Sequence, residues 1–242
     1  MQLDYDTIRR GYKNTIEKPN HIYRYELYAR LLFAEKYWNK TVGEEKLICI
    51  DEGQDASYNE YLLIMRQNRK NRCYYNVYGD LNQRIKHGRG MRDWDQLNTK
   101  MIGHLYYLNE NYRNTNQITK YCNDVFGYNM TLTGVDGDLV KYITFENVLQ
   151  EIQLIADKNE RVVILMPRSM GKIRVTQNKA LDEEFRKNSI SARYGEKHIA
   201  VMFVDEAKGI EFDRVYVLDS LMEKNEKYIA YTRALNNLII VR

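Results

Sequence analysis

Apolar residues recur along the chain in two patterns. Short, mainly apolar segments, typical of strands in a buried parallel sheet, fall at 47–50, 74–78, 139–143, 162–166, 200–204, 214–218 and 238–241. Stretches with helical spacing lie between them at 116–126, 147–158, 178–187 and 224–234, and Pro19 divides residues 4–40 into two further helices. This alternation predicts an α/β fold whose parallel sheet is covered by helices on both faces.

Acidic residues follow the first two apolar runs directly. Asp51 and Glu52 come after 47–50, and Gly79 and Asp80 come after 74–78. Ligands of open α/β sheets bind just outside such strand ends. One carboxylate of an adjacent pair can hold Mg²⁺ while its neighbour accepts a proton from an attacking water. The same pattern also arises where a chain simply returns from a buried strand to solvent, so the acidic pair alone leaves both interpretations open.

Composition limits the class of protein. The 242 residues are 44% hydrophobic, enough for a substantial core, and the formal charge of +4 permits a nucleic-acid partner without requiring one. Three widely separated cysteines suggest neither a zinc site nor disulfides. With no apolar run near the roughly 20 residues of a membrane span and no signal-peptide core, we expect a cytoplasmic protein without a membrane partner. The 21 tyrosines suit either base stacking or a compositional bias.

Five short strings give the acidic pair a context. Together, and in this order, they resemble the motifs of UvrD/Rep-type superfamily 1 DNA helicases. The strings are IDEGQD at 50–55, GDLNQ at 79–83, LNENYR at 108–113, KGIEFD at 208–213 and YIAYTRA at 228–234.

The resemblance implies a fold and a division into domains. Residues 1–107 would form an incomplete first RecA-like domain that carries the Walker B strand. Residues 108–242 would form the second RecA-like motor domain. This domain would be minimal, because the stretch between the LNENYR and KGIEFD strings is too short for a large inserted subdomain.

The resemblance also implies roles in ATP hydrolysis. Asp51 would coordinate Mg²⁺ and Glu52 would be the catalytic base. Gln83 would sense the γ-phosphate or the attacking water, because an amide can donate and accept at once. Arg113 and Arg233 would be arginine fingers acting from the second domain across the interdomain cleft, a role suited to a permanently charged planar fork. ATP and Mg²⁺ are therefore the expected cofactors.

Three further positions follow from the fourth of these strings, KGIEFD. Glu211 would bond the nucleotide ribose, and Lys208 with Gly209 would shape a loop that links the ATP state to the DNA track. A lysine beside a glycine also occurs for turn geometry alone, which leaves a purely structural reading of Lys208 open.

The chain departs from the family in its phosphate-binding loop. No G-x-x-x-x-G-K-[ST] string occurs in the sequence. The nearest approach, at Gly171 and Lys172, has Met166 in place of the first glycine and Ile173 in place of the hydroxyl residue. We therefore expect an upstream region or a partner chain to supply this loop.

The expected DNA-facing positions also differ. Lys86 and Gly88 stand where the family has stacking rings, and Phe203 and Asp205 stand where it has a T-x-H string. A carboxylate at the latter place would repel phosphate. Basic residues that could still follow the backbone of single-stranded or partly duplex DNA are Arg84, Lys86 and Arg89.

Three functions remain open on the sequence. The first is the C-terminal portion of an ATP-dependent DNA helicase or translocase, inactive without the missing loop. The second is a catalytically silent helicase-like module that binds protein or nucleic acid. The third, a basic DNA-binding domain without nucleotide chemistry, leaves the five ordered strings unexplained.

Overall fold

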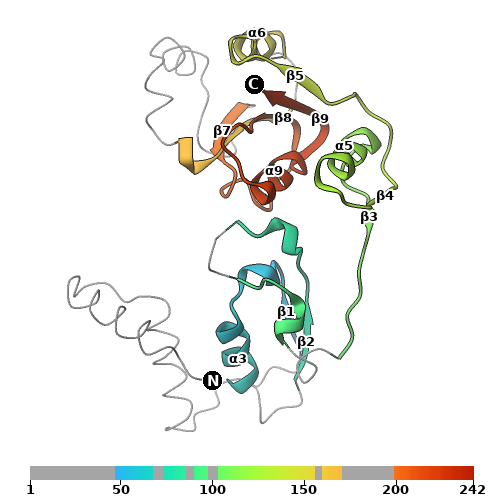
Figure 1. Cartoon of the computed structure of the whole chain (residues 1–242), viewed down its shortest axis with the longest axis vertical. Helices are drawn as coiled ribbons and strands as arrows, with labels where there is room; N and C mark the ends of the chain where they lie inside the picture. The colour runs from blue at the N-terminus through green and yellow to red at the C-terminus, as the bar shows by residue number, and fades with distance from the viewer. Residues whose placement is uncertain (1–46, 68–72, 86–89, 98–102, 156–159, 171–198) are drawn as a thin grey trace, which may run out of the picture. The chain divides into compact units, whose positions relative to one another are not determined.

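The computed structural model describes residues 47–67, 73–85, 90–97, 103–155, 160–170 and 199–242. The chain divides into two compact units (Figure 1). Unit 1 comprises Met1–Leu81 and Lys86–His104, and unit 2 comprises Asn82–Ile85 and Leu105–Arg242. The predicted helices within 4–40 and at 178–187 lie outside the described residues.

In unit 1, two parallel strands precede the acidic residues. Strand β1 (Leu47–Ile50) pairs with β2 (Tyr74–Val77), with Leu47 opposite Tyr74 and Ile50 opposite Val77. Both strands were expected from their apolar runs, and their positions are confirmed. Because the pair is parallel and in register, Asp51 and the Gly79–Asp80 turn follow the same end of this sheet.

The core of unit 1 gathers around helix α3 (Tyr58–Gln67), an element that the sequence did not predict. Its Tyr61 packs with Met91 and with Leu97 of the short helix η3 (Trp94–Leu97). The Tyr61 hydroxyl donates to the Gly53 carbonyl at 2.7 Å, within the short helix η1 (Gly53–Asp55). A buried hydroxyl thus holds the turn that follows β1.

Tyr61 gives unit 1 a predictable response to alkali. Burial, followed by the charge of Glu60, raises the pKa of Tyr61 to about 12, against about 10 for an unfolded tyrosine. Its stabilisation is therefore complete below pH 10 or so and is lost as the pH rises towards 12. We expect Tyr61→Phe to lower the free energy of unfolding by about 1 kcal/mol at pH 8, and this deficit to shrink and reverse between pH 10 and 12. Urea unfolding at several pH values tests this, and a deficit that stays constant to pH 12 would contradict it.

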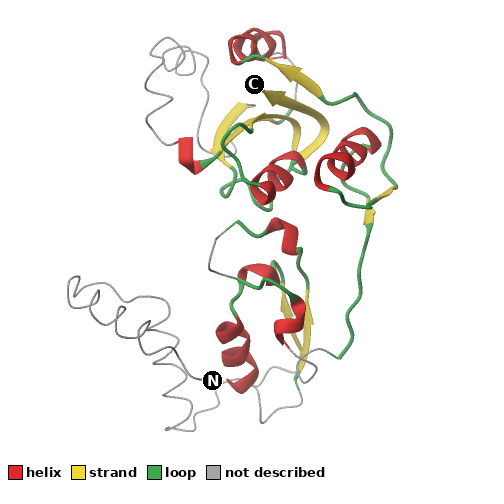
Figure 2. Cartoon of the chain, viewed as in Figure 1, coloured by secondary structure: helices red, strands yellow, loops and turns green. Residues whose placement is uncertain are grey.

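Unit 2 contains a five-stranded, entirely parallel sheet of order β5-β9-β8-β6-β7 (Figure 2). Its strands are β5 (Lys141–Ile143), β6 (Val162–Met166), β7 (Ile199–Phe203), β8 (Phe212–Leu218) and β9 (Ala234–Val241). The predicted mixed α/β architecture with a parallel sheet is confirmed for this unit.

Alternate residues of the strands face opposite layers, as strand geometry requires. In β6, Val163 and Leu165 belong to a core shared with helices α5 (Asn116–Phe126) and α9 (Lys224–Tyr231). Val162 and Ile164 belong to a second core with helix α6 (Phe145–Ile155). Helices therefore cover both faces of the sheet, with α6 on one side and α5 and α9 on the other (Figure 1).

The predicted end of the last helix is wrong. Helix α9 ends at Tyr231, and Ala234, expected to be helical, is the first residue of β9. The Thr232 hydroxyl bonds the Tyr228 and Ile229 carbonyls, and the Arg233 carbonyl accepts from the Phe212 main-chain N–H at 2.9 Å. Side-chain capping and sheet pairing thus end the helix before Arg233, which lies in a turn.

A small second sheet joins β3 (Glu110–Asn111) to β4 (Thr131–Leu132), again in parallel. It was not predicted, and it places the N-Y-R string beside the start of α5. None of the helices in the described residues combines the length and the apolar character needed to cross a bilayer.

Candidate functional site

The carboxylates of unit 1 lie in a strained turn after β1. Glu52 has φ 51° and ψ 39°, a left-handed conformation that costs a non-glycine residue about 1–3 kcal/mol. Among the described residues it is the only non-glycine residue with positive φ. Its main-chain N–H donates to Asp51 Oδ1 at 2.8 Å. Such strain persists where the surroundings impose a particular side-chain direction, which makes Glu52 a candidate for chemistry.

Gln54 connects this turn to the second strand end. It is fully buried, and its amide Nε2 donates to Glu52 Oε2 while its Oε1 accepts the Asp80 main-chain N–H at 3.0 Å. Its carbonyl accepts the Met91 main-chain N–H at 2.9 Å. A side chain added at Gly79 would strike the Gln54 amide, so the glycine of the GDLNQ string is needed for this contact. One buried amide therefore orients the predicted base and joins the IDEGQD and GDLNQ strings.

Removing this amide should destabilise unit 1. Gln54→Met keeps the volume but removes the acceptor of the Asp80 main-chain N–H and the donor to Glu52 from a fully buried side chain, and we expect a loss of about 2–3 kcal/mol in the free energy of unfolding. Gln96→Met is the matched control, because Gln96 is exposed and its side chain accepts the Arg92 main-chain N–H within its own turn. Urea unfolding compares the two, and equal losses would contradict the role of Gln54.

The donor set of this turn fits a nucleotide-bound Mg²⁺. Asp51 is exposed, and within the described part of the chain its Oδ2 has no hydrogen-bond partner. No group of three or more candidate metal ligands occurs among the residues the structure describes. Mg²⁺ in phosphoryl-transfer enzymes typically takes one or two carboxylates and completes its shell with water and phosphate. A single available carboxylate oxygen suits that mode of binding.

In unit 2, two of the strings predicted to contact ATP, LNENYR and KGIEFD, meet through Arg113. Its guanidinium Nε lies 2.6 Å from Glu211 Oε1, and both side chains are about two-fifths exposed, at 43% and 38%. The Arg113 main-chain N–H donates to Asn111 Oδ1 at 3.0 Å. The predicted finger and the predicted ribose contact, 98 positions apart in sequence, thus form an ion pair.

Arg233, the second predicted finger, is buried, with 2% of its surface exposed. Its Nε donates to the Ile229 carbonyl at 3.1 Å, and its Nη1 lies 3.5 Å from the Ile210 carbonyl. Its Nη2 lies 3.4 Å from the Thr232 hydroxyl and 3.5 Å from Gln83 Oε1. These neutral oxygens orient the guanidinium but do not themselves cancel its charge.

Gln83 reaches Arg233 because residues 82–85 belong to unit 2. Ile85 packs against the core cluster that includes residues of α9, and Asn225 Nδ2 donates to the Arg84 carbonyl at 2.9 Å. The predicted sensor therefore contacts a predicted finger. Arg84, proposed for nucleic acid, is half-buried. Lys86 and Arg89 lie outside the described residues.

Two asparagines that sequence reasoning left without a role hold the arginines in place. Asn114 is 3% exposed, and its Nδ2 donates to the carbonyls on either side of Arg233, at 3.3 Å to Thr232 and 2.6 Å to Ala234. Asn111 Nδ2 in turn donates to Asn114 Oδ1 at 2.9 Å. The LNENYR and YIAYTRA strings are thereby joined, and the only sequence signal was the asparagines flanking Arg113.

Asn114 should accordingly be sensitive to a change of one atom. Asn114→Asp would place a carboxylate against two carbonyl oxygens, and we expect it to lower the free energy of unfolding by about 3 kcal/mol. Asn236→Asp, on the exposed face of β9, should change it by less than about 0.5 kcal/mol. Urea unfolding measures both. A loss of unfolding free energy in Asn114→Asp no larger than that in Asn236→Asp would contradict the role of Asn114.

The KGIEFD string lies in the turn between β7 and β8. Gly209 has φ 80°, and nothing lies within 4 Å of a side chain built there, so the glycine is required by backbone geometry rather than by space. The Ile210 main-chain N–H donates to the Ala207 carbonyl at 3.0 Å. The turn geometry therefore accounts for the glycine at position 209. The role of Lys208, which is half-buried, remains a prediction.

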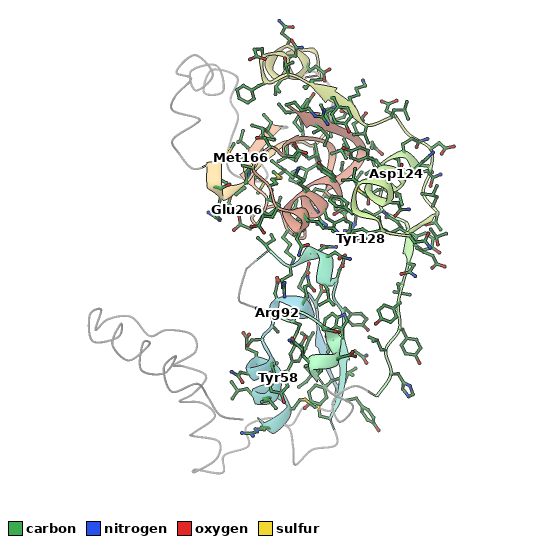
Figure 3. All side chains as sticks on the ribbon, in the orientation of Figure 1. Tyr58, Arg92, Asp124, Tyr128, Met166 and Glu206 are labelled. Atoms are coloured by element: carbon green, nitrogen blue, oxygen red, sulfur yellow. The ribbon has the colours of Figure 1, made fainter. Side chains whose placement is uncertain are left out.

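Asp205, at a position expected to face DNA, is paired with an arginine. Arg168 Nε lies 2.7 Å from Asp205 Oδ2 and its Nη2 lies 3.2 Å from Glu206 Oε1, while its guanidinium sits 4.8 Å from the centre of the Phe203 ring. The hydrogen bond with Asp205 raises the pKa of Arg168. Met166 and Glu206, labelled in Figure 3, mark the carboxyl ends of β6 and β7, where these residues gather. The repulsion expected from Asp205 is therefore offset within the chain.

Solved structures with a similar backbone arrangement include the C-terminal domain of a possible DNA helicase from Lactobacillus plantarum WCFS1. It is 23% identical over 54% of this chain and 86% of that one, with a TM-score of 0.41. The PRRSV helicase is 13% identical over 80% of this chain and 34% of that one, with a TM-score of 0.47. Arterivirus nonstructural protein 10, a helicase in complex with DNA, is 17% identical over 83% and 41%, with a TM-score of 0.49. The chain thus spans less than half of these two viral chains.

No protein-family model matches the sequence, and no curated protein matches it either.

Proposed function

We propose that this chain is the C-terminal portion of an ATP-dependent DNA helicase or translocase of superfamily 1. It would contribute the catalytic carboxylates and the arginine fingers for ATP hydrolysis coupled to movement on single-stranded DNA. The observation that carries the proposal is the linkage of three separate strings in unit 2. Arg113 forms an ion pair with Glu211, and Asn111 and Asn114 join the Arg113 segment to the main chain on either side of Arg233.

Each residue has a task that its surroundings suit. Glu52, directed by Gln54, accepts the proton of the attacking water, and Asp51 holds Mg²⁺ through its available oxygen. Arg113 and Arg233 stabilise charge on the transferred phosphoryl group. The contact between Arg233 Nη2 and Gln83 Oε1 is long for a hydrogen bond, at 3.5 Å, and we expect it to be exchanged for a contact with a phosphate oxygen. On this proposal, the phosphate-binding loop would be supplied from outside these 242 residues.

A silent helicase-like module is the second candidate. It is favoured by the Arg168–Asp205–Glu206 cluster. There the two carboxylates form ion pairs with Arg168, which would otherwise be available to bind a DNA phosphate. On this alternative the chain binds a protein or nucleic acid through the same fold without hydrolysing ATP.

The test uses the protein purified from its natural host through an affinity tag, with any polypeptide that co-purifies, here called the native protein. We expect Mg²⁺-dependent ATP hydrolysis that single-stranded DNA stimulates, and negligible hydrolysis by the isolated 242-residue chain. Native protein that hydrolyses no ATP with or without DNA would favour the silent module. Efficient hydrolysis by the isolated chain would show that the expected need for an external phosphate-binding loop is wrong.

A further inference from the structure

The ion pair between Arg113 and Glu211 leaves one edge of the arginine open. Glu211 Oε1 engages Nε, at 2.6 Å, and the two side chains come from the start of unit 2 and from the residue before β8. Within the described part of the chain, neither Nη of Arg113 has a hydrogen-bond partner, and the side chain is 43% exposed. The guanidinium is thus held on one side only.

A guanidinium held by its Nε edge is oriented to bind a phosphate through its two Nη groups. It carries five N–H donors in a planar fork, and four of them lie on the two Nη groups. Those groups can form two parallel hydrogen bonds with phosphoryl oxygens, a geometry that requires the plane of the fork to be fixed. An exposed ion pair contributes little to folding stability, so the orientation of Arg113 is the main effect left for Glu211.

We propose that Glu211 is a positioning residue, which holds Arg113 by its Nε edge so that both Nη groups face the terminal phosphate of a nucleoside triphosphate. This inference rests on the proposed function, and it gives Glu211 a task other than contact with the ribose. The proposal also predicts the direction in which loss of Glu211 changes the affinity for phosphate. A carboxylate near a phosphate site repels the anion, so loss of Glu211 would strengthen phosphate binding unless its orienting role dominates.

The probe is inorganic tripolyphosphate, which has no ribose, titrated into the native protein by calorimetry. Glu211→Asp keeps the charge but falls short of Nε, and Arg113→Ala removes the fork. Each should weaken binding by about 10-fold, and the double variant should be no weaker than either single one. Glu211→Gln keeps the reach and an acceptor oxygen, so it should stay within about 3-fold of wild type. Glu146→Asp, exposed on α6, is the control and should bind as wild type does.

Either of two results overturns the proposal. One is a Glu211→Asp chain that binds tripolyphosphate as tightly as wild type, even if it binds ATP more weakly, since that pattern assigns Glu211 to the ribose. The other is wild-type native protein that does not bind tripolyphosphate.

Arginine-labelled NMR tests the contact itself without any ligand. The Nε–H signal of Arg113, identified by its loss in Arg113→Lys, should shift in Glu211→Asp and remain in place in Glu146→Asp. An Arg113 Nε–H signal that does not shift in Glu211→Asp overturns the proposal. A shifted signal and weakened tripolyphosphate binding, combined with native protein that hydrolyses no ATP, would reject the proposed function alone.

Discussion

Arg233→Lys is expected to lower the rate of ATP hydrolysis by the native protein about 10³-fold, the lower end of what an arginine finger contributes. Lysine keeps the positive charge but has no planar fork, so it cannot reproduce the set of contacts that Arg233 makes to the Ile229 and Ile210 carbonyls and to Gln83. Steady-state hydrolysis with saturating DNA measures the effect.

Arg214→Lys is the matched control, because Arg214 is also a buried arginine of unit 2, 9% exposed and paired with Glu160 at 2.9 Å. Both variants should lower the melting temperature, and only Arg233→Lys should lower the rate of hydrolysis about 10³-fold. Equal rates in the two variants would mean that Arg233 serves the fold alone, as a cap on the last carbonyls of α9.

Glu52→Gln should have the second largest effect, lowering kcat by about 10²- to 10⁴-fold, the range of a general base. The substitution keeps the size of the side chain and the neighbouring Gln54, but it removes the group that accepts the proton. Because the nucleotide is held by other residues, its affinity should change by less than about 3-fold. Rapid-quench and nucleotide-binding measurements on the native protein separate the two quantities.

Glu60→Gln provides the comparison, since Glu60 is a half-buried carboxylate of the same unit that bonds the Ser57 main-chain N–H at 2.6 Å. Its loss should affect stability and leave kcat unchanged. A Glu52→Gln protein with a normal kcat would return the strained turn to a structural role.

Elements with a strong local pattern were predictable from the sequence. The five apolar residues of β6 can only be buried on both faces, and α5 has the predicted bounds because its apolar spacing ends at Gly127, whose φ of 71° suits a helix terminus. The end of α9 was not predictable in this way. Its residues continue to favour a helix, and the pairing of the Arg233 and Phe212 main chains, 21 positions apart, overrides them.

The candidate site shows the same division. The residue types that could do chemistry, such as Glu52 and Arg113, stood out because their motifs are short and local. The residues that orient them did not, because their partners are distant: Asn114 bonds carbonyls 118 and 120 positions away, and Gln54 bonds a main-chain N–H 26 positions away. The sequence alone does not show which distant group an asparagine or glutamine side chain will bond.

The central claim, that Arg233 acts on the terminal phosphate of a nucleotide, is tested most directly by comparing nucleotide affinities. Binding of a non-hydrolysable ATP analogue and of ADP should be measured for native wild-type and Arg233→Lys protein. We predict that the variant binds the ATP analogue at least about 10-fold more weakly, as expected for one lost charge-assisted contact, and binds ADP with unchanged affinity. Equal affinity of the variant and the wild type for the ATP analogue would contradict the claim.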